Sequence, residues 1–395
     1  MLIKKLDYIT EFFLWVLAVG ITVNNAPTEV ATGILIFIFL VKRFILKKIP
    51  LPNSPINIFL YLLFIIVLIS ALRSSYFKES IRGFSRIPKY IFLYFALLDF
   101  FCADKKRLVR FFWVLLTVST VTFLNGIFQS IFGFDLFKHN MIDEPDSLRR
   151  ISSSFVHPND FGAYIISVLP LTFLVFSSVF TKRKRLLIGL VFLLGAYCLM
   201  KTSSRGAWVG FLFGAMLYFF MYNKKIAIVI PVVILLLIAF SPHGFERLSS
   251  LFRTEQNTVW ERTQLWQGTW AIIKEHPVLG FGVNTFSKYF PQYKPVDYPD
   301  LRYAHNSYLQ MWSEIGIVGL FTFLAIPVIV LRKTFGGIKN KITMGFSGLL
   351  LLGLISGYIG FLIHSAFDNN LFSLVLTTLF WVFTAYIVSL NKCLK

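Results

Sequence analysis

The sequence predicts an all-α fold, that of a polytopic integral membrane protein with about twelve transmembrane helices. Hydrophobic residues make up 56% of the 395 positions, charged residues only 15%, and the mean hydropathy is +0.70. This composition is far more apolar than that of a soluble domain. Apolar runs of about 20 residues, enough to cross a hydrocarbon core of roughly 30 Å, recur along the chain. Clusters of basic residues alternate with these runs.

The predicted spans follow one another through the chain, which we expect to form a single membrane domain over residues 1–395. No small-residue cleavage site follows the first apolar run, so this run is expected to remain as an anchor. The span centres lie near Val16, Ile36, Phe64, Phe95, Val118, Val168, Leu193, Leu212, Val233, Phe321, Leu352 and Thr378.

The basic clusters predict the orientation of the chain in the membrane. The formal net charge is +20, but the positive residues are spread between the spans, which argues against a nucleic-acid-binding surface. Because Lys and Arg accumulate in cytoplasmic loops, these clusters assign both termini to the cytoplasm. The clusters are Lys4 and Lys5, Lys42 to Lys48, Lys105 to Arg110, Lys182 to Arg185, Lys224 and Lys225, Arg332 to Lys341, and Lys392 to Lys395.

Residues 242–305 form a long polar insert, which this orientation places on the opposite side of the membrane as a large external loop. Thr258 and Glu261 have the spacing of a capping box, and the residue before Pro277 disfavours helix. We therefore expect a helix over about 259–275. Three residues lie one turn apart on one face of this helix, namely Arg262, Trp266 and Trp270. This pattern is typical of an amphipathic helix that lies on a membrane surface.

Arg205 is the first candidate for a functional residue. It lies at the predicted outer boundary of two spans, where a guanidinium that faces lipid is costly, so it is expected to face a wet cavity or an anion. Ser203 and Ser204 add hydroxyl donors, and Gly206 permits close backbone approach, so the group resembles an anion cradle. The alternatives are an arginine that snorkels to the headgroups at Arg205 and an ordinary solvated arginine at Arg262.

His305 is the candidate general base, because imidazole changes its protonation near neutral pH and can take a proton from a hydroxyl nucleophile. Asn306 follows it at the outer end of the tenth span. Glu314 lies inside that span, where a carboxylate is a functional candidate that either pairs with an arginine or orients a catalytic group. Arg82 and Arg86, at helical spacing in an outer loop, are further candidates for phosphate contacts.

Several short motifs, taken in their order and spacing, resemble the O-antigen ligase family, a bacterial superfamily that also contains O-antigen polymerases and protein-glycosylating relatives. The likeness covers essentially the whole chain. The motifs are Phe155-Val-His-Pro-Asn159, Ser203-Ser-Arg-Gly206, Arg262 with Trp266 and Trp270, Pro277-Val-Leu-Gly-Phe-Gly282, Ala304-His-Asn-Ser-Tyr-Leu309 and Glu314-Ile-Gly-Ile-Val-Gly319.

The resemblance implies a membrane glycosyltransferase of the cytoplasmic (inner) membrane whose active site faces the periplasm. The implied donor is a glycan on undecaprenyl pyrophosphate, and the implied acceptor is a sugar hydroxyl of lipid A-core. By the same resemblance, Arg205 and Arg262 grip the pyrophosphate and His305 acts as the base in an inverting transfer. No metal-binding or phosphate-loop motif occurs, so a reaction without metal or cofactor is expected.

Two other functions remain open from the sequence. A polymerase would use the same chemistry with a second carrier-linked glycan as acceptor. A transporter of lipid-linked glycan would need paired cavities and broken helices at mid-membrane, whereas the polar residues here gather at the outer face.

Overall fold

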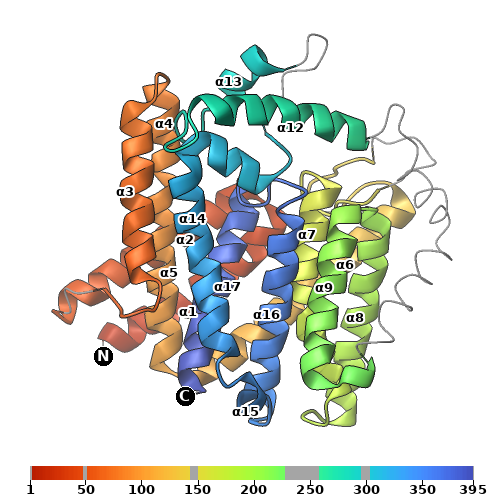
Figure 1. The fold of residues 1–395 in the computed structure, drawn as a ribbon. Helices are drawn as coiled ribbons and strands as arrows, with labels where there is room; N and C mark the ends of the chain where they lie inside the picture. Colours follow the sequence, from red (N-terminus) through yellow and green to blue (C-terminus); the bar gives the residue numbers. More distant parts are fainter. Residues whose placement is uncertain (1, 48–50, 143–149, 227–257, 295–302, 395) are drawn as a thin grey trace.

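The computed structural model describes residues 2–47, 51–142, 150–226, 258–294 and 303–394, and these residues form a helical bundle (Figure 1). Within these ranges β structure is limited to an isolated bridge between Phe134 and Met141. The helices are α1 (Leu2–Val23), α2 (Asn25–Ile45), α3 (Asn57–Arg73), α4 (Phe77–Phe84), α5 (Arg86–Ala103), α6 (Lys105–Phe132), α7 (Pro158–Val168), the 3₁₀ helix η1 (Leu169–Phe176), α8 (Lys182–Thr202), α9 (Arg205–Tyr222), α12 (Thr258–Glu275), α13 (Phe286–Tyr293), α14 (Ser307–Phe335), α15 (Ile338–Ile342), α16 (Phe346–His364) and α17 (Leu374–Cys393).

The predicted fold class, an all-α polytopic membrane protein, is confirmed. Every predicted span centre that falls within the described ranges lies in a helix, whereas the centre at Val233 falls outside them. Seven of the described helical segments are long and apolar enough to cross a membrane: Leu2–Val23, Lys105–Phe132, Pro158–Phe176, Lys182–Thr202, Ser307–Phe335, Phe346–His364 and Leu374–Cys393. A shorter apolar helix covers Asn57–Arg73. The total of about twelve spans stays a prediction.

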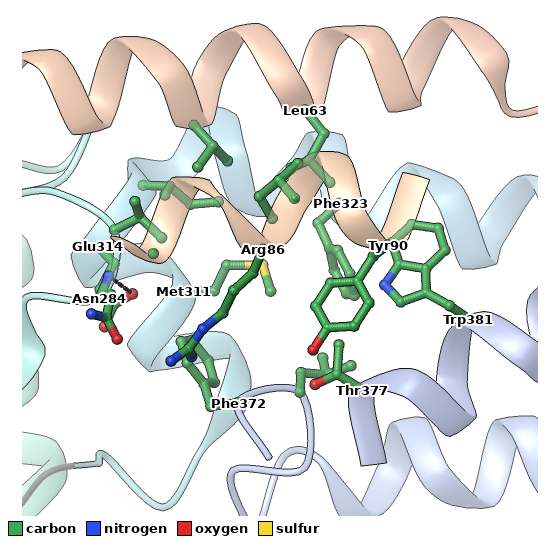
Figure 2. Close-up of a pocket in the computed structure, with 16 residues that line it drawn as sticks. Leu63, Arg86, Tyr90, Asn284, Met311, Glu314, Phe323, Phe372, Thr377 and Trp381 are labelled. Atoms are coloured by element: carbon green, nitrogen blue, oxygen red, sulfur yellow. Dashed lines mark hydrogen bonds between the residues drawn. The ribbon is translucent and has the colours of Figure 1, made fainter. Parts of the chain in front are cut away.

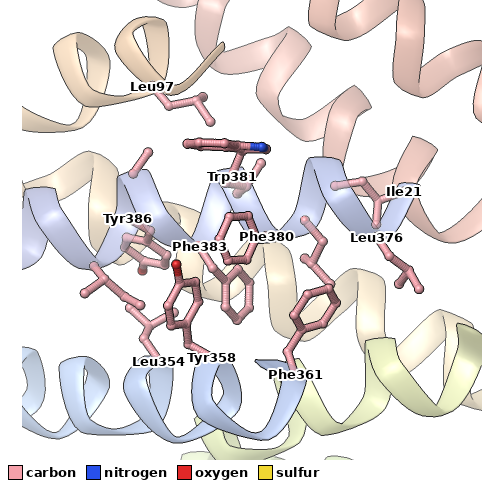
Figure 3. Close-up of a cluster of buried hydrophobic side chains, with 14 of the residues drawn as sticks. Ile21, Leu97, Leu354, Tyr358, Phe361, Leu376, Phe380, Trp381, Phe383 and Tyr386 are labelled. Atoms are coloured by element: carbon pink, nitrogen blue, oxygen red, sulfur yellow. The ribbon is translucent and has the colours of Figure 1, made fainter. Parts of the chain in front are cut away.

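Helix α17 occupies the centre of the bundle. In its most apolar stretch 94% of the residues are buried, compared with 28% in the corresponding stretch of α8 at the periphery. Aromatic side chains of α17 pack against several neighbours, as in the stack of Phe380 on Tyr358 of α16 (Figure 3). The hydroxyl of Tyr386 donates to the Leu108 carbonyl of α6 at 2.6 Å, so a polar group in the apolar interior is satisfied.

Both chain ends lie at one end of the bundle, opposite α12 and α13 (Figure 1). Ion pairs tie helix ends together there, because Lys42 and Arg107 both reach Asp7 at 2.7 Å. Buried Lys341 donates to Asn391 Oδ1 near the C-terminus at 2.7 Å. Basic residues from three of the predicted cytoplasmic clusters therefore meet their partners close to the chain termini.

Helix α12 lies across the other end of the bundle (Figure 1). It runs over Thr258–Glu275, so the helix predicted over 259–275 is confirmed, including its end before Pro277. Its apolar side packs against α13 in a small cluster that contains Leu265, Ile272 and Phe290. Trp270 is 44% exposed and contacts Trp312 of α14 edge to face, so α12 is anchored on the outer end of α14.

Helix α14 is opened at Gly316, whose φ of 71° and ψ of 177° are not helical. The segment from Pro277 to Gly282 lies in this opening. The amides of Phe281 and Gly282 donate to the carbonyls of α14, and the amide of Ile317 donates back to Pro277 at 2.9 Å. In an apolar environment each unpaired backbone group is costly, so the inserted segment allows α14 to break without leaving its backbone unpaired.

We predict that Gly316→Ala destabilises the fold. A positive φ costs a residue with a side chain about 1–3 kcal/mol, and a Cβ at this position would overlap the Val278 carbonyl. The apparent melting temperature of the detergent-solubilised protein should fall by several degrees. Gly33→Ala is the matched control, because a Cβ there meets nothing within 4 Å. Equal melting temperatures for the two variants would contradict the proposed packing.

Candidate active site

His305 sits at the outer end of α14 in a backbone conformation fixed from both sides. Its φ is +46°, in the left-handed region that residues with side chains seldom adopt. The preceding Ala304 donates its amide to Gln310 Oε1 at 3.0 Å and accepts from the Trp266 indole of α12 at 3.1 Å. The following Asn306 caps α14 by accepting the amides of Tyr308 and Leu309. The strained turn is held in place by these contacts and presents the imidazole, which is 42% exposed.

A carboxylate lies beside this imidazole. His305 Nδ1 is 3.3 Å from Oδ1 of Asp368, which lies in the turn between α16 and α17. The same turn is fastened to α14, because Ser307 Oγ donates to the Asp368 carbonyl at 2.8 Å. Burial on its own would raise the pKa of Asp368, but the hydrogen bonds from His305 and from the Asn369 amide hold this pKa well below its usual range. Asp368 therefore stays ionised.

A chain of hydrogen bonds connects this pair to the turn that carries Arg205. The side-chain Nδ2 of Asn159 donates to Asp368 Oδ2 at 2.6 Å, and Arg150 donates to Asn159 Oδ1 at 2.8 Å. Arg150 also donates through Nε to the Thr202 carbonyl at 2.8 Å, at the end of α8. Segments separated by more than 200 residues thus meet at Asp368.

Arg205 begins α9 after a tight turn. Ser203 has a φ of +52°, and the Ser204 hydroxyl lies 3.4 Å from His364 Nε2 at the end of α16. A Cβ added to Gly206 would lie 2.9 Å from the His364 ring, so only glycine lets α9 approach α16 this closely. The close approach brings the start of α9 toward the Asp368 turn.

Arg262 of α12 belongs to the same electrostatic neighbourhood. Its positive charge acts on the Arg205 guanidinium, so the two arginines repel each other. It also acts on His157, the residue that caps α7. Burial, and next the charge of Arg150, lower the pKa of His157, and the charges of His305 and Arg262 act in the same direction. The charge of Arg262 therefore reaches both Arg205 and His157.

A cavity of about 460 Å³ borders the His305–Asp368 pair. Neither Arg205 nor Arg262 is among the residues that line it. Its charged and imidazole side chains are Arg86, Lys138, His157, Asp160, His305 and Asp368, and its polar side chains include Thr22, Asn24, Ser154, Tyr303, Asn369 and Ser373. A polar cavity of this size falls within the range of small-molecule sites.

The remaining predicted site residues are placed as follows. Glu314 is buried and binds backbone, because it accepts the amide of Asn284 at 2.6 Å and the side chain of Gln310 at 3.2 Å. It thereby holds the loop that follows the inserted segment. Arg82 is exposed on α4 and lines neither of the two cavities described here.

Arg86 lies where the polar cavity meets a smaller apolar pocket of about 100 Å³, and it lines both. Figure 2 shows its side chain extending among Met311, Phe372 and Tyr90, which line the smaller pocket. Arg86 is thus at the boundary between the smaller apolar pocket and the polar cavity that His305 lines.

Sequence reasoning did not single out Asp368, Arg150 or Asn159 as parts of one network. An available signal for Asp368 was its position as an acidic residue between two strongly apolar spans. Asn159 ends one of the motifs named above, but nothing local to that motif identifies Asp368 as its partner. Arg150 looks like an ordinary loop arginine until its contacts are known.

The arrangement suits removal of a proton from a hydroxyl next to an anionic leaving group. With Nδ1 directed at Asp368, the His305 Nε2 is the nitrogen available to accept a proton. Arginines such as Arg205 and Arg262 can neutralise negative charge on phosphate oxygens. Within the described ranges, no group of three or more His, Cys, Asp or Glu side chains is arranged to hold a metal ion.

The chain is similar to several known proteins. A family model described as O-antigen ligase matches residues 190–324, which include Arg205, Arg262 and His305. The chain is 25% identical over 337 residues to an O-antigen ligase of Salmonella typhimurium, a match that covers 80% of this chain and 78% of the relative.

Two further relatives carry other names. The chain is 23% identical over 339 residues to a ComP-specific O-oligosaccharyltransferase of Acinetobacter baylyi, covering 78% of this chain and 58% of the relative. It is 21% identical over 324 residues to the teichuronic acid biosynthesis protein TuaE of Bacillus subtilis, covering 77% of this chain and 64% of that protein. The chain thus spans less than two thirds of each of these two relatives. Together with the family match over residues 190–324, these similarities to an O-antigen ligase and an O-oligosaccharyltransferase support a membrane glycosyltransferase.

Proposed function

We propose that this protein is an O-antigen ligase that transfers a glycan from undecaprenyl pyrophosphate to a sugar hydroxyl of lipid A-core. The observation that carries the proposal is the His305–Asp368 pair, 3.3 Å apart, with the positive charges of Arg205 and Arg262 beside it. A base next to two guanidiniums is what an attack on a carbon bearing a pyrophosphate requires.

In the proposed step, His305 Nε2 takes the proton of the acceptor hydroxyl while that oxygen attacks the anomeric carbon of the donor. The bond from this carbon to the pyrophosphate oxygen breaks, and its electron pair leaves with the pyrophosphate. Attack from the face opposite the leaving group inverts the configuration. The proton on His305 later passes to solvent, which restores the base.

Arg205 and Arg262 act on the leaving group. Pyrophosphate departs readily only when its growing negative charge is neutralised, and a guanidinium offers two parallel donors to phosphate oxygens. The two arginines repel each other, so a dianion between them relieves that repulsion as well as forming new bonds. They supply the charge that a divalent cation supplies in other phosphate chemistry, and the proposed reaction is metal-independent.

Asp368 positions the base. Its ionised carboxylate accepts from His305 Nδ1 and stabilises the imidazolium that forms as the proton is taken. Asn159 and Arg150 in turn hold the carboxylate, which fixes the imidazole relative to the turn that carries Arg205.

We further propose that the protein lies in the bacterial cytoplasmic membrane with both termini in the cytoplasm and the site facing the periplasm. Support comes from the basic clusters, because Lys42, Arg107 and Lys341 lie with the chain termini at the end of the bundle opposite α12. Residues 242–305 are then a periplasmic loop within one membrane domain. The lipid-carrier donor and the lipid acceptor would both reach the site from the outer leaflet.

A reconstituted assay tests the function directly. Purified protein in liposomes receives undecaprenyl-pyrophosphate-linked glycan together with lipid A-core, in a buffer containing EDTA. We expect glycan-modified lipid A-core at a rate that EDTA leaves unchanged within about twofold, because arginines and not a metal neutralise the leaving group. Only a longer carrier-linked chain would identify a polymerase and overturn the ligase assignment.

We predict that His305→Ala lowers the transfer rate by roughly a hundred- to ten-thousand-fold, the range of general base catalysis. Asp368→Asn should also lower kcat more than it raises the KM of either substrate, because its main effect is to misorient the base. Since the two residues act as a unit, the double variant should be no slower than His305→Ala alone. If the rate loss of the double variant equals the product of the two single losses, Asp368 does not act through His305.

We predict that Arg205→Lys and Arg262→Lys each lower kcat/KM for the donor by about tenfold or more, because a point charge does not reproduce the forked contact. Arg73→Lys is the matched control, an exposed arginine at the end of α3 that lines neither cavity. Full activity of Arg205→Lys would mean that this guanidinium only reaches toward the headgroups.

A further inference from the structure

The polar cavity in front of His305 is not used by the donor pyrophosphate in the proposed reaction. Arg205 and Arg262 are absent from its lining, whereas His305 and Asp368 form part of its wall. An inverting displacement needs the attacking hydroxyl and the leaving group on opposite sides of the reacting carbon. The acceptor hydroxyl must also reach His305, and this cavity is bounded by His305, so it is a place where the acceptor can bind.

Arg86 gives this cavity a specific chemical character. It is exposed, and among the described residues it has no ion pair or hydrogen bond. Its neighbour Lys89, one turn further along α5, is already paired with Glu29 at 2.5 Å. Lys138 adds a second positive charge to the cavity, although its amino group donates to the Ser154 carbonyl at 2.6 Å. The Arg86 guanidinium is thus available to an incoming anion.

Asn369 offers unused hydrogen-bonding capacity in the same wall. It is only 8% exposed, and both its side-chain nitrogen and its side-chain oxygen lack a hydrogen-bond partner within the described part of the chain. Buried amides are normally paired, because leaving such a group unsatisfied costs stability. A sugar hydroxyl, which both donates and accepts, would satisfy it.

We propose that this cavity is the acceptor-sugar subsite and that Arg86 binds an anionic phosphate group carried by the acceptor. The inference rests on the proposed function for the role of His305 as base. A phosphate on lipid A-core and the pyrophosphate of a second carrier-linked glycan have the same chemistry, and both are amphiphiles. The apolar pocket on the other side of Arg86, lined by residues such as Leu63, Phe323 and Trp381, suits the lipid-proximal part of either one.

The test compares Arg86→Gln with the wild-type protein on matched acceptors in the liposome assay. The acceptors are lipid A-core and chemically dephosphorylated lipid A-core, and, in a second arm, carrier-linked glycan and the same glycan on a neutral lipid anchor. We expect Arg86→Gln to raise the KM of the phosphorylated acceptor about tenfold or more, the effect of losing one charge-assisted hydrogen bond. The KM of the phosphate-free acceptor and that of the donor should stay within about twofold.

Arg73→Gln is the control for loss of a positive charge at the outer end of the bundle, and it should behave as wild type in both arms. In the wild-type protein, the phosphorylated acceptor should have a lower KM than its phosphate-free counterpart. The acceptor pair for which Arg86→Gln removes this difference identifies the molecule that carries the phosphate. An unchanged acceptor KM, or a rise in the KM of the donor instead, would overturn the proposal while leaving the transferase assignment standing.

A binding measurement separates failure of this inference from failure of the proposed function. The His305→Ala variant, which should not turn over the donor, is placed in nanodiscs with and without the Arg86→Gln substitution. Each protein is titrated with fluorescently labelled lipid A-core and, separately, with labelled carrier-linked glycan. If no acceptor is modified by the wild-type protein, the proposed function fails, but binding that depends on Arg86 and on the phosphate still supports the subsite. Binding that is indifferent to Arg86 overturns it.

Discussion

The buried Asp368 carboxylate is the interaction on which the whole site depends. Taking a carboxylate out of water is costly unless hydrogen bonds replace its hydration, and here His305, Asn159 and the Asn369 amide provide them. These three donors come from the start of α14, the start of α7 and the α16–α17 turn. Satisfying one charge therefore fixes the relative position of three elements and the orientation of the imidazole.

The opening of α14 at Gly316 also helps to fix the position of His305, here through backbone hydrogen bonds. A helix inside an apolar layer can break only where other protein groups pair its backbone, and the segment from Pro277 to Gly282 supplies that pairing. The segment connects directly to α12, so docking it also sets where Arg262 lies. The Trp266 indole of α12 then donates to the Ala304 carbonyl, next to His305, at 3.1 Å. The position of the inserted segment and the position of His305 are therefore linked through α12.

Charge is divided across the site in a way that matches a displacement reaction. Arg86 and Lys138 line the polar cavity together with His305, whereas Arg205 and Arg262 are not among its lining residues. Holding all four cations together would be costly through mutual repulsion. In the proposed reaction, one pair of cations would serve the leaving group and the other pair the molecule that replaces it.

The sequence by itself determined the helical membrane fold, the helix over 259–275 and the identity of the main candidates, because hydropathy, caps and residue chemistry are local properties. Only the tertiary structure brought Asp368 to His305, linked Asn159 and Arg150 to the turn of Arg205, and gave Glu314 a backbone-binding role. It also separated Arg86, which lines the cavity, from Arg82 four residues earlier, which does not. Such contacts join residues up to 209 positions apart, and no local pattern encodes which distant groups will compensate a buried charge.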